Sequence, residues 1–123
     1  MKTIHTDLAP AAVGPYSQAK ATEQFVFTSG QIPLDPVTGA LVGDDIAAQS
    51  EQALTNLKAV LEEAGSDCSK VLKTTCFLTD MGNFAAFNEV YAKYFPDRPA
   101  RSCFAVVALP KGALVEVEAV AEL

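Results

Sequence analysis

Residues 99–104 read Pro99-Ala100-Arg101-Ser102-Cys103-Phe104, and residues 114–118 read Leu114-Val115-Glu116-Val117-Glu118. Both stretches are rich in apolar or β-branched residues, and the turn-forming segment Leu109-Pro110-Lys111-Gly112 lies between them. This pattern predicts two β-strands. Alternate side chains of a strand share a face, so we expect Arg101 and Cys103 on one face of the first strand.

Arg101 is one of only two arginines in the chain and lies in its most apolar quarter. A guanidinium there needs an anionic partner, because an unpaired buried charge is costly. The alternation of the second strand places Glu116 and Glu118 on one face, so one interpretation is an internal ion pair with Arg101. The other is that Arg101 holds the carboxylate of a ligand while a nearby glutamate handles water. Spacing alone leaves both open.

The size and composition indicate one compact domain, residues 1–123. Half of the residues are hydrophobic, which is enough for a real core and high enough that we expect the chain to associate with copies of itself. No apolar run approaches the roughly 20 residues of a membrane-spanning helix. The first residues are too polar for a signal peptide, so we expect a cytoplasmic protein that makes no membrane contact.

The charged and metal-binding residues argue against several classes of function. The formal charge is −6 and the nine lysines and arginines are dispersed, whereas nucleic-acid binding needs basic clusters. Three cysteines without a CxxC pair predict reduced thiols, and a single histidine, His5, predicts no metal site. The same scarcity of histidine argues against a Cys–His or Ser–His nucleophilic pair.

The remaining pattern predicts two helices and three further strands. We expect a short strand within residues 1–23, and strands at 24–30 and 70–79. Helices are expected at 45–64, begun by Asp44 or Asp45 and stopped by Gly65, and at 84–95, capped by Asn83. The predicted order is β-β-α-β-α-β-β, an α+β domain with a mixed sheet and both helices on one face.

One face of this sheet is expected to need cover from outside the chain. Two helices can cover only one face of such a sheet, and the other face is too apolar to be left in water. We assign Val120 and the row that runs through Arg101, Cys103, Ala105 and Val107 to this second face. A symmetric oligomer would cover it, which predicts a pocket at a subunit boundary that contains Arg101 and Glu116.

Several polar residues are candidates for that pocket. Gly14-Pro15 fixes the orientation of Tyr16, whose ring can cap the core or whose hydroxyl can line a pocket. Gly30 ends a strand, where glycine often marks a close approach by a ligand or by another backbone, and Ser29 and Gln31 add polar groups beside it. Asn88 lies beside the apolar stripe of the second helix, as a surface amide or as a pocket amide.

Five segments taken together resemble a known family. They are Gly14-Pro15-Tyr16-Ser17-Gln18, Thr28-Ser29-Gly30-Gln31-Ile32-Pro33, Lys73-Thr74-Thr75-Cys76-Phe77-Leu78, Phe87-Asn88-Glu89-Val90-Tyr91, and Pro99-Ala100-Arg101-Ser102-Cys103 followed by Leu109-Pro110-Lys111 and Val115-Glu116-Val117-Glu118-Ala119. In this order, over nearly the whole chain, they are similar to the motifs of the RidA (YjgF-type) reactive-intermediate deaminases. The segment before Pro99 is shorter than in some members, which can alter the rim of the pocket.

The resemblance implies a chorismate-mutase-like fold and a homotrimer with clefts between its subunits. It implies a hydrolase acting on the C=N bond of 2-imino acids, such as 2-iminobutanoate and 2-iminopropanoate. These reactive products of pyridoxal-phosphate dehydratases would be converted to 2-oxo acids and ammonia, without a metal or organic cofactor. The expected partners are the small imino or oxo acid and other copies of the chain.

The residue types fit this chemistry. Arg101 suits a two-pronged grip on the substrate carboxylate, and backbone N–H groups near Gly30 and Cys103 can complete the cradle. Glu116 is expected to hold and partly deprotonate the attacking water. Tyr16 is expected to donate to that water or to the imine nitrogen. The residues expected to shape the substrate pocket are Ser29, Gln31 and Asn88.

Other interpretations remain open. Glu118 shares a face with Glu116 and competes for the role of water holder, and Cys103 can be read as a covalent nucleophile instead of a backbone contact. A trimeric sensor that binds small 2-oxo or amino-acid carboxylates without turnover fits every residue except Glu116. A ribonuclease or translation inhibitor fits less well, because of the acidic charge and the lone His5.

Overall fold

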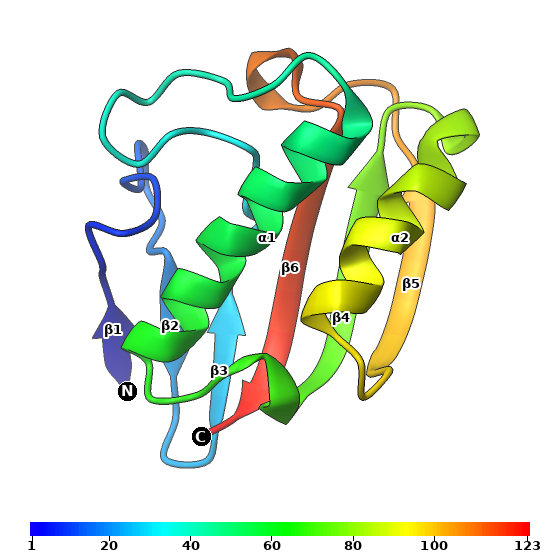
Figure 1. Cartoon of the computed structure of the whole chain (residues 1–123). Coiled ribbons are helices and arrows are strands. Elements are labelled where there is room, and N and C mark those ends of the chain that lie inside the picture. Colours follow the sequence, from blue (N-terminus) through cyan, green and yellow to red (C-terminus); the bar gives the residue numbers. More distant parts are fainter.

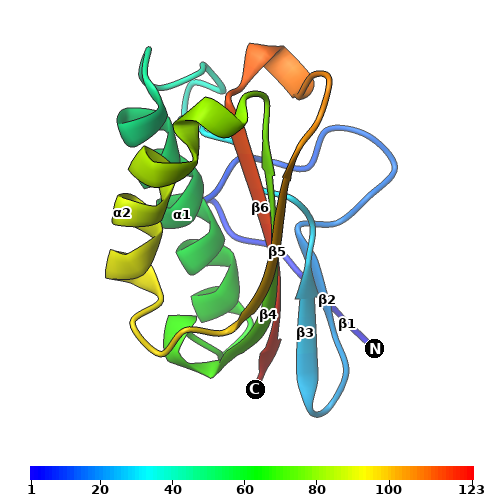
Figure 2. The same ribbon diagram turned by 90° about the vertical axis from the view of Figure 1, so that its right-hand side faces the viewer.

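The computed structural model describes all 123 residues and has two layers. A six-stranded mixed sheet forms one layer, and two α-helices pack side by side on one of its faces (Figures 1 and 2). The α+β fold with both helices on one face is therefore confirmed. No helix is both long and apolar enough to cross a membrane.

The sheet runs in the order β1-β2-β3-β6-β4-β5, with β4 and β5 parallel and all other neighbours antiparallel. The elements are β1 (Lys2–Ile4), β2 (Ala19–Ala21), β3 (Phe25–Thr28), α1 (Ile46–Glu63), β4 (Val71–Leu78), α2 (Phe84–Tyr94), β5 (Ala100–Ala105) and β6 (Val115–Glu122). Short 3-10 turns lie at Cys68–Lys70, Met81–Asn83 and Pro110–Gly112. Strand β5, which carries Arg101, is thus an edge of the sheet.

Two details of the predicted elements were wrong. Strand β2 was not predicted, because Ala-Lys-Ala has little β propensity and forms a strand only by pairing with β1 and β3. Asn83 precedes α2 but makes no side-chain capping bond. Instead, Asp80 accepts a hydrogen bond from Gly82 N at 2.8 Å and starts a 3-10 turn that leads directly into the helix.

The predicted cap and stop of the first helix are confirmed. Asp45 accepts a hydrogen bond from Ala48 N at 2.9 Å, which satisfies one of the free donors at the start of α1. Gly65 follows the helix with φ +89°, a left-handed conformation that glycine adopts without a side-chain clash.

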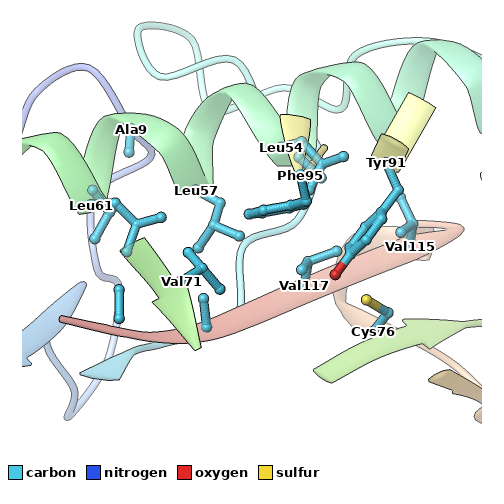
Figure 3. Close-up of a cluster of buried hydrophobic side chains, with 14 of the residues drawn as sticks. Ala9, Leu54, Leu57, Leu61, Val71, Cys76, Tyr91, Phe95, Val115 and Val117 are labelled. Atoms are coloured by element: carbon cyan, nitrogen blue, oxygen red, sulfur yellow. The ribbon is translucent and has the colours of Figure 1, made fainter. Parts of the chain in front are cut away.

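The core lies between the helices and the sheet. Leu54, Leu57 and Leu61 of α1 and Val115 and Val117 of β6 are fully buried in one cluster (Figure 3). Cys76 lies in the same cluster, as expected for a structural cysteine. Each large apolar side chain buried in this way contributes roughly 1.5–3 kcal/mol to folding.

Strand register shows that Arg101 lies on the helix side of the sheet. Arg101 pairs with Thr74 and Cys103 with Cys76, and both β4 partners are buried beneath the helices. Their assignment to the uncovered face was therefore wrong, and Val107 lies beyond the end of β5, fully exposed. A strand's alternation shows which residues share a face, but only the pairing with its neighbours shows which face that is.

The opposite face of the sheet is open within the chain. Glu116 pairs with Phe77 and Glu118 with Thr75, so both glutamates project there, away from the helices. Phe104 and Phe27 remain about half exposed on the same face, and the rings of Phe77 and Phe104 stack edge to face at 5.3 Å. Part of the segment between β1 and β2 projects beyond this face (Figure 2).

Candidate active site

The predicted site residues form two sets on opposite faces of the sheet. Arg101, Asn88 and Cys103 lie at the β5 edge, on the side of α2. The second set lies where β2 and β6 begin and β3 ends, next to the open face, and consists of Tyr16, Ser29, Gly30, Gln31 and Glu116. The structure therefore excludes a direct Arg101–Glu116 or Arg101–Glu118 ion pair within one chain, and none is present.

Helix α2 holds the Arg101 side chain. One guanidinium N–H donates to Asn88 Oδ1 at 2.7 Å, and the guanidinium lies over the rings of Tyr91, at 4.7 Å, and Phe84, at 5.4 Å. Aromatic faces attract a cation without neutralising its charge. Asn88 is therefore not a free surface amide, and Arg101 is fixed in place while most of its N–H donors stay available.

Open space lies beside the Arg101 guanidinium. A hollow of about 390 Å³ is lined by Asn88, Tyr91, Ala92, Phe95, Arg98, Pro99 and Arg101. Arg101 is only partly buried and makes no contact with a carboxylate within the chain. The guanidinium is neither locked internally nor directed into bulk solvent, and it can accept an external anion.

Cys103 lies next to Arg101 on β5 and is partly buried. Burial raises the pKa of its thiol, and Arg101 opposes this effect only in part. A thiol with a raised pKa is mostly protonated at neutral pH and is a weak nucleophile. The structure favours the interpretation in which Cys103 contributes its backbone, not its sulfur.

Glu116 is the one carboxylate of the second set, and its environment changes its pKa. Burial raises the pKa of Glu116, and the neighbouring charge of Glu118 raises it further. A carboxyl group with a raised pKa accepts a proton more readily, which is the property needed in a general base.

Gly30 lies directly against the Glu116 carboxylate. A Cβ atom at this position would come within 1.9 Å of Glu116 Oε2, so only glycine leaves room for the carboxylate. Two backbone hydrogen bonds hold the Gly30 segment against β6. Gln31 N donates to Val117 O at 2.8 Å, and Val117 N donates back to Gln31 O at 3.1 Å. The group that approaches Gly30 within the chain is therefore the Glu116 side chain, and not another backbone.

Tyr16 does not cap the core, because its side chain is 53% exposed. Gly14, with φ +123°, turns the chain before it, and Tyr16 N donates to Gly14 O at 2.9 Å. Tyr16 lines a hollow of about 370 Å³ together with Gly30 and Gln31. The other lining residues are Pro10, Ala11, Val13, Gln18, Ile32, Leu34, Pro110 and Lys111. The pocket interpretation of Tyr16 is therefore the one that the structure favours.

Two buried amides that the sequence analysis did not select hold the walls of this second hollow. Gln18 accepts a hydrogen bond from Thr6 N at 2.7 Å and donates to Pro10 O at 2.8 Å. Asn56 of α1 donates to Ile32 O at 3.1 Å and to Leu34 O at 2.9 Å. Asn56 was detectable as a polar residue close to the apolar stripe of its helix, but its partners are far away in sequence.

The Ser29 hydroxyl makes a structural contact within the chain. Its hydroxyl donates to Ser17 O at 2.6 Å, and its backbone N donates to Gln18 O at 2.8 Å. Ser29 therefore ties the segment that carries Tyr16 to the end of β3. No group of three or more His, Cys, Asp or Glu side chains that could hold a metal ion is present.

Many known proteins are similar to this chain. The family model described as Endoribonuclease L-PSP matches residues 6–123. The 2-iminobutanoate/2-iminopropanoate deaminase of Salmonella typhimurium is 48% identical over 124 residues, covering 98% of this chain and 96% of that protein. AldR of Lactococcus lactis, provisionally described as a regulator, is 49% identical over 124 residues. The match covers 100% of this chain and 98% of that protein.

A solved structure agrees with the fold over the full chain. The crystal structure of Escherichia coli TdcF with bound serine matches with a TM-score of 0.95 and 42% sequence identity, covering 100% of this chain and 99% of that one.

Proposed function

The chain belongs to the Endoribonuclease L-PSP family, which includes the RidA and YjgF proteins, and from this premise we propose that it hydrolyses 2-imino acids to 2-oxo acids and ammonia. The observation that carries the proposal is the Arg101 guanidinium, which is held by Asn88 and two aromatic rings, has no carboxylate partner, and borders an open hollow. The name of the Salmonella relative supports the same reaction.

Arg101 would bind the carboxylate of the imino acid. A guanidinium offers two parallel N–H donors that match the two carboxylate oxygens, and fixing this group also fixes the adjacent C=N carbon. The backbone near Cys103 lies beside it on the same strand. Orientation of this kind can contribute several kcal/mol to a reaction whose electrophile is already reactive.

Glu116 would activate the water. Its carboxylate takes one proton from water as the oxygen adds to the C=N carbon, and the nitrogen takes a proton from the Tyr16 hydroxyl, which gives a carbinolamine. Glu116 then passes its proton to the amine nitrogen, and the carbinolamine hydroxyl returns a proton to Tyr16. The C–N bond then breaks as the C=O bond forms, releasing ammonia and the 2-oxo acid. No residue becomes covalently attached, in agreement with the raised pKa of the Cys103 thiol.

The complete site would form between two copies of the chain in a homotrimer. Arg101 and Glu116 lie on opposite faces of one sheet, so a single chain cannot direct both at one small substrate. The open sheet face carries half-exposed Phe27 and Phe104, and burial of such a surface favours association. Packing the β5 edge of one copy near the open face of the next would bring the two sets together.

A sensor that binds amino-acid or oxo-acid carboxylates without turnover is the second candidate. Its support is the regulator role suggested for the AldR relative and the serine held by TdcF. The Arg101 set suits binding alone as well as catalysis, whereas the raised pKa of Glu116 favours the enzyme.

A coupled assay separates the two candidates. A threonine dehydratase supplies 2-iminobutanoate, and release of 2-oxobutanoate is followed with and without this protein. The enzyme predicts faster release, abolished by Arg101→Ala and sharply slowed by Glu116→Ala, with Lys2→Ala at the opposite sheet edge as the control. If the wild type binds 2-oxobutanoate through Arg101 but gives no acceleration, the sensor is correct.

A further inference from the structure

The hollow beside Arg101 also contains Arg98, and these are the only two arginines of the chain. Arg98 lies on the segment between α2 and β5, and Arg101 is the second residue of β5. The chain as a whole carries a formal charge of −6. Two guanidinium groups at one hollow of an acidic protein form a local site for anions.

Neither arginine is neutralised within the chain. The three ion pairs present join His5 to Asp7, Lys58 to Glu62 and Lys93 to Glu51. Arg98 makes no side-chain hydrogen bond, and its chain neighbour Asp97 does not pair with it. Arg101 uses one N–H for Asn88, so most of the ten N–H donors of the two side chains remain free.

The residues that line the hollow suit a ligand with a short carbon chain and more than one anionic group. Its other walls are Tyr91, Ala92, Phe95 and Pro99, with the Asn88 amide as a further polar group and no acidic residue. Arg98 is placed at this hollow by a tight turn, in which its φ is +55° and its N–H donates to Phe95 O at 3.2 Å. A non-glycine residue rarely adopts this conformation.

We propose that Arg98 binds a second carboxylate, and that the substrates include 2-imino dicarboxylic acids. The inference rests on the proposed function, in which Arg101 holds the carboxylate next to the C=N carbon. The substrate side chain then lies along the apolar wall, and its terminal carboxylate reaches Arg98. Because guanidinium groups bind carboxylates in a two-pronged manner, this contact selects for the dicarboxylate over a monocarboxylate of equal length.

Binding of stable 2-oxo acids tests the inference by isothermal titration calorimetry at low salt. The matched pair is 2-oxopentanedioate and 2-oxopentanoate, which have the same carbon chain and differ in one carboxylate. Wild type is expected to bind the dicarboxylate about tenfold more tightly, equivalent to about 1.4 kcal/mol. Arg98→Gln is expected to remove this advantage and leave the affinity for 2-oxopentanoate within about twofold.

Lys2→Gln is the control, because it removes one exposed positive charge at the opposite edge of the sheet. It is expected to keep the preference. Equal binding of the two acids by wild type, or a preference that persists in Arg98→Gln, overturns the inference and leaves the proposed function standing. Failure of wild type to bind either acid, or binding that survives Arg101→Ala, overturns both.

Discussion

Glu116 is half-buried against Gly30 with Glu118 beside it, and these surroundings raise its pKa. The charged form is therefore disfavoured in the folded chain. A general base must nevertheless be charged to accept a proton. At neutral pH the charged Glu116 therefore lowers the stability of the fold while it provides the base for the reaction.

Glu116→Gln is expected to lower the deaminase rate by about 10²–10⁴-fold and to raise the free energy of unfolding at neutral pH. The pKa of Glu116 in the folded state lies above the usual value of 4.5. The stability of the wild type therefore falls as the pH rises from about 4.5 toward this raised pKa. The gain from the substitution should therefore vanish below about pH 4.5 in urea unfolding measurements. Glu118→Gln is the matched control, and a larger rate loss there assigns the water to Glu118.

Gly30→Ala is expected to lower the rate by about 10²-fold, because a displacement of 1 Å at a reacting group has this effect. The new Cβ would meet the Glu116 carboxylate at 1.9 Å, and the flexible end of that side chain can move aside without unfolding the strand. Gly82→Ala, at an exposed turn, should keep full activity. Steady-state kinetics and thermal unfolding compare the two, and an unchanged rate in Gly30→Ala contradicts the placement of Glu116.

At the scale of elements, α1 does more than cover one face of the sheet. Asn56 holds the segment at Ile32 and Leu34, and Gln49 donates to Gly43 O at 3.0 Å and accepts from Leu114 N at 2.8 Å. One helix therefore fixes two loops and the entry to β6, near the walls of the Tyr16 hollow.

Asn56→Ala is expected to cost about 1–3 kcal/mol of unfolding free energy, because it leaves Leu34 O without its side-chain donor in a buried region and leaves Ile32 O with only the bond from Leu34 N. The substrate KM should also rise as the wall loosens. Glu63→Ala, at an exposed position of the same helix, should change stability by less than about 0.5 kcal/mol. Urea unfolding gives both values, and equal stabilities would exclude the anchoring role.

Helices and long strands were predictable from sequence, because α1, α2, β4 and β6 each carry a clear apolar period. Strand β2 was not, since its three residues gain their structure only from their neighbours. The face occupied by Arg101 was also beyond prediction, because it depends on the register between β5 and β4. The candidate site residues were selected from residue type and position and then from motif resemblance, whereas Asn56 and Gln18 act through partners distant in sequence.

For the whole molecule, the separation of Arg101 and Glu116 on opposite faces makes a prediction about assembly. In the proposed homotrimer, mixed assemblies of Arg101→Ala and Glu116→Gln chains, each nearly inactive alone, should recover about a quarter of the wild-type activity. Each restored site takes an intact arginine from one copy and an intact glutamate from its neighbour. No recovery after verified subunit exchange would mean that both groups act within one chain.

Phe27→Glu is expected to dissociate the oligomer and abolish activity, because it places a charge on the apolar open face, where Phe27 is 51% exposed. Analytical ultracentrifugation measures the assembly, and circular dichroism checks that the chain stays folded. Val37→Glu, on an exposed turn, is the control and should keep the assembly state of the wild type. A fully active monomeric Phe27→Glu protein would contradict a site shared between copies.

The division of the site across one sheet also links turnover to abundance. Below the concentration at which the copies associate, each chain would be folded but inactive. The specific activity should therefore decline on dilution with no loss of secondary structure. A cell making twice as much of such a protein near that threshold would gain more than twice the clearance of its reactive metabolite.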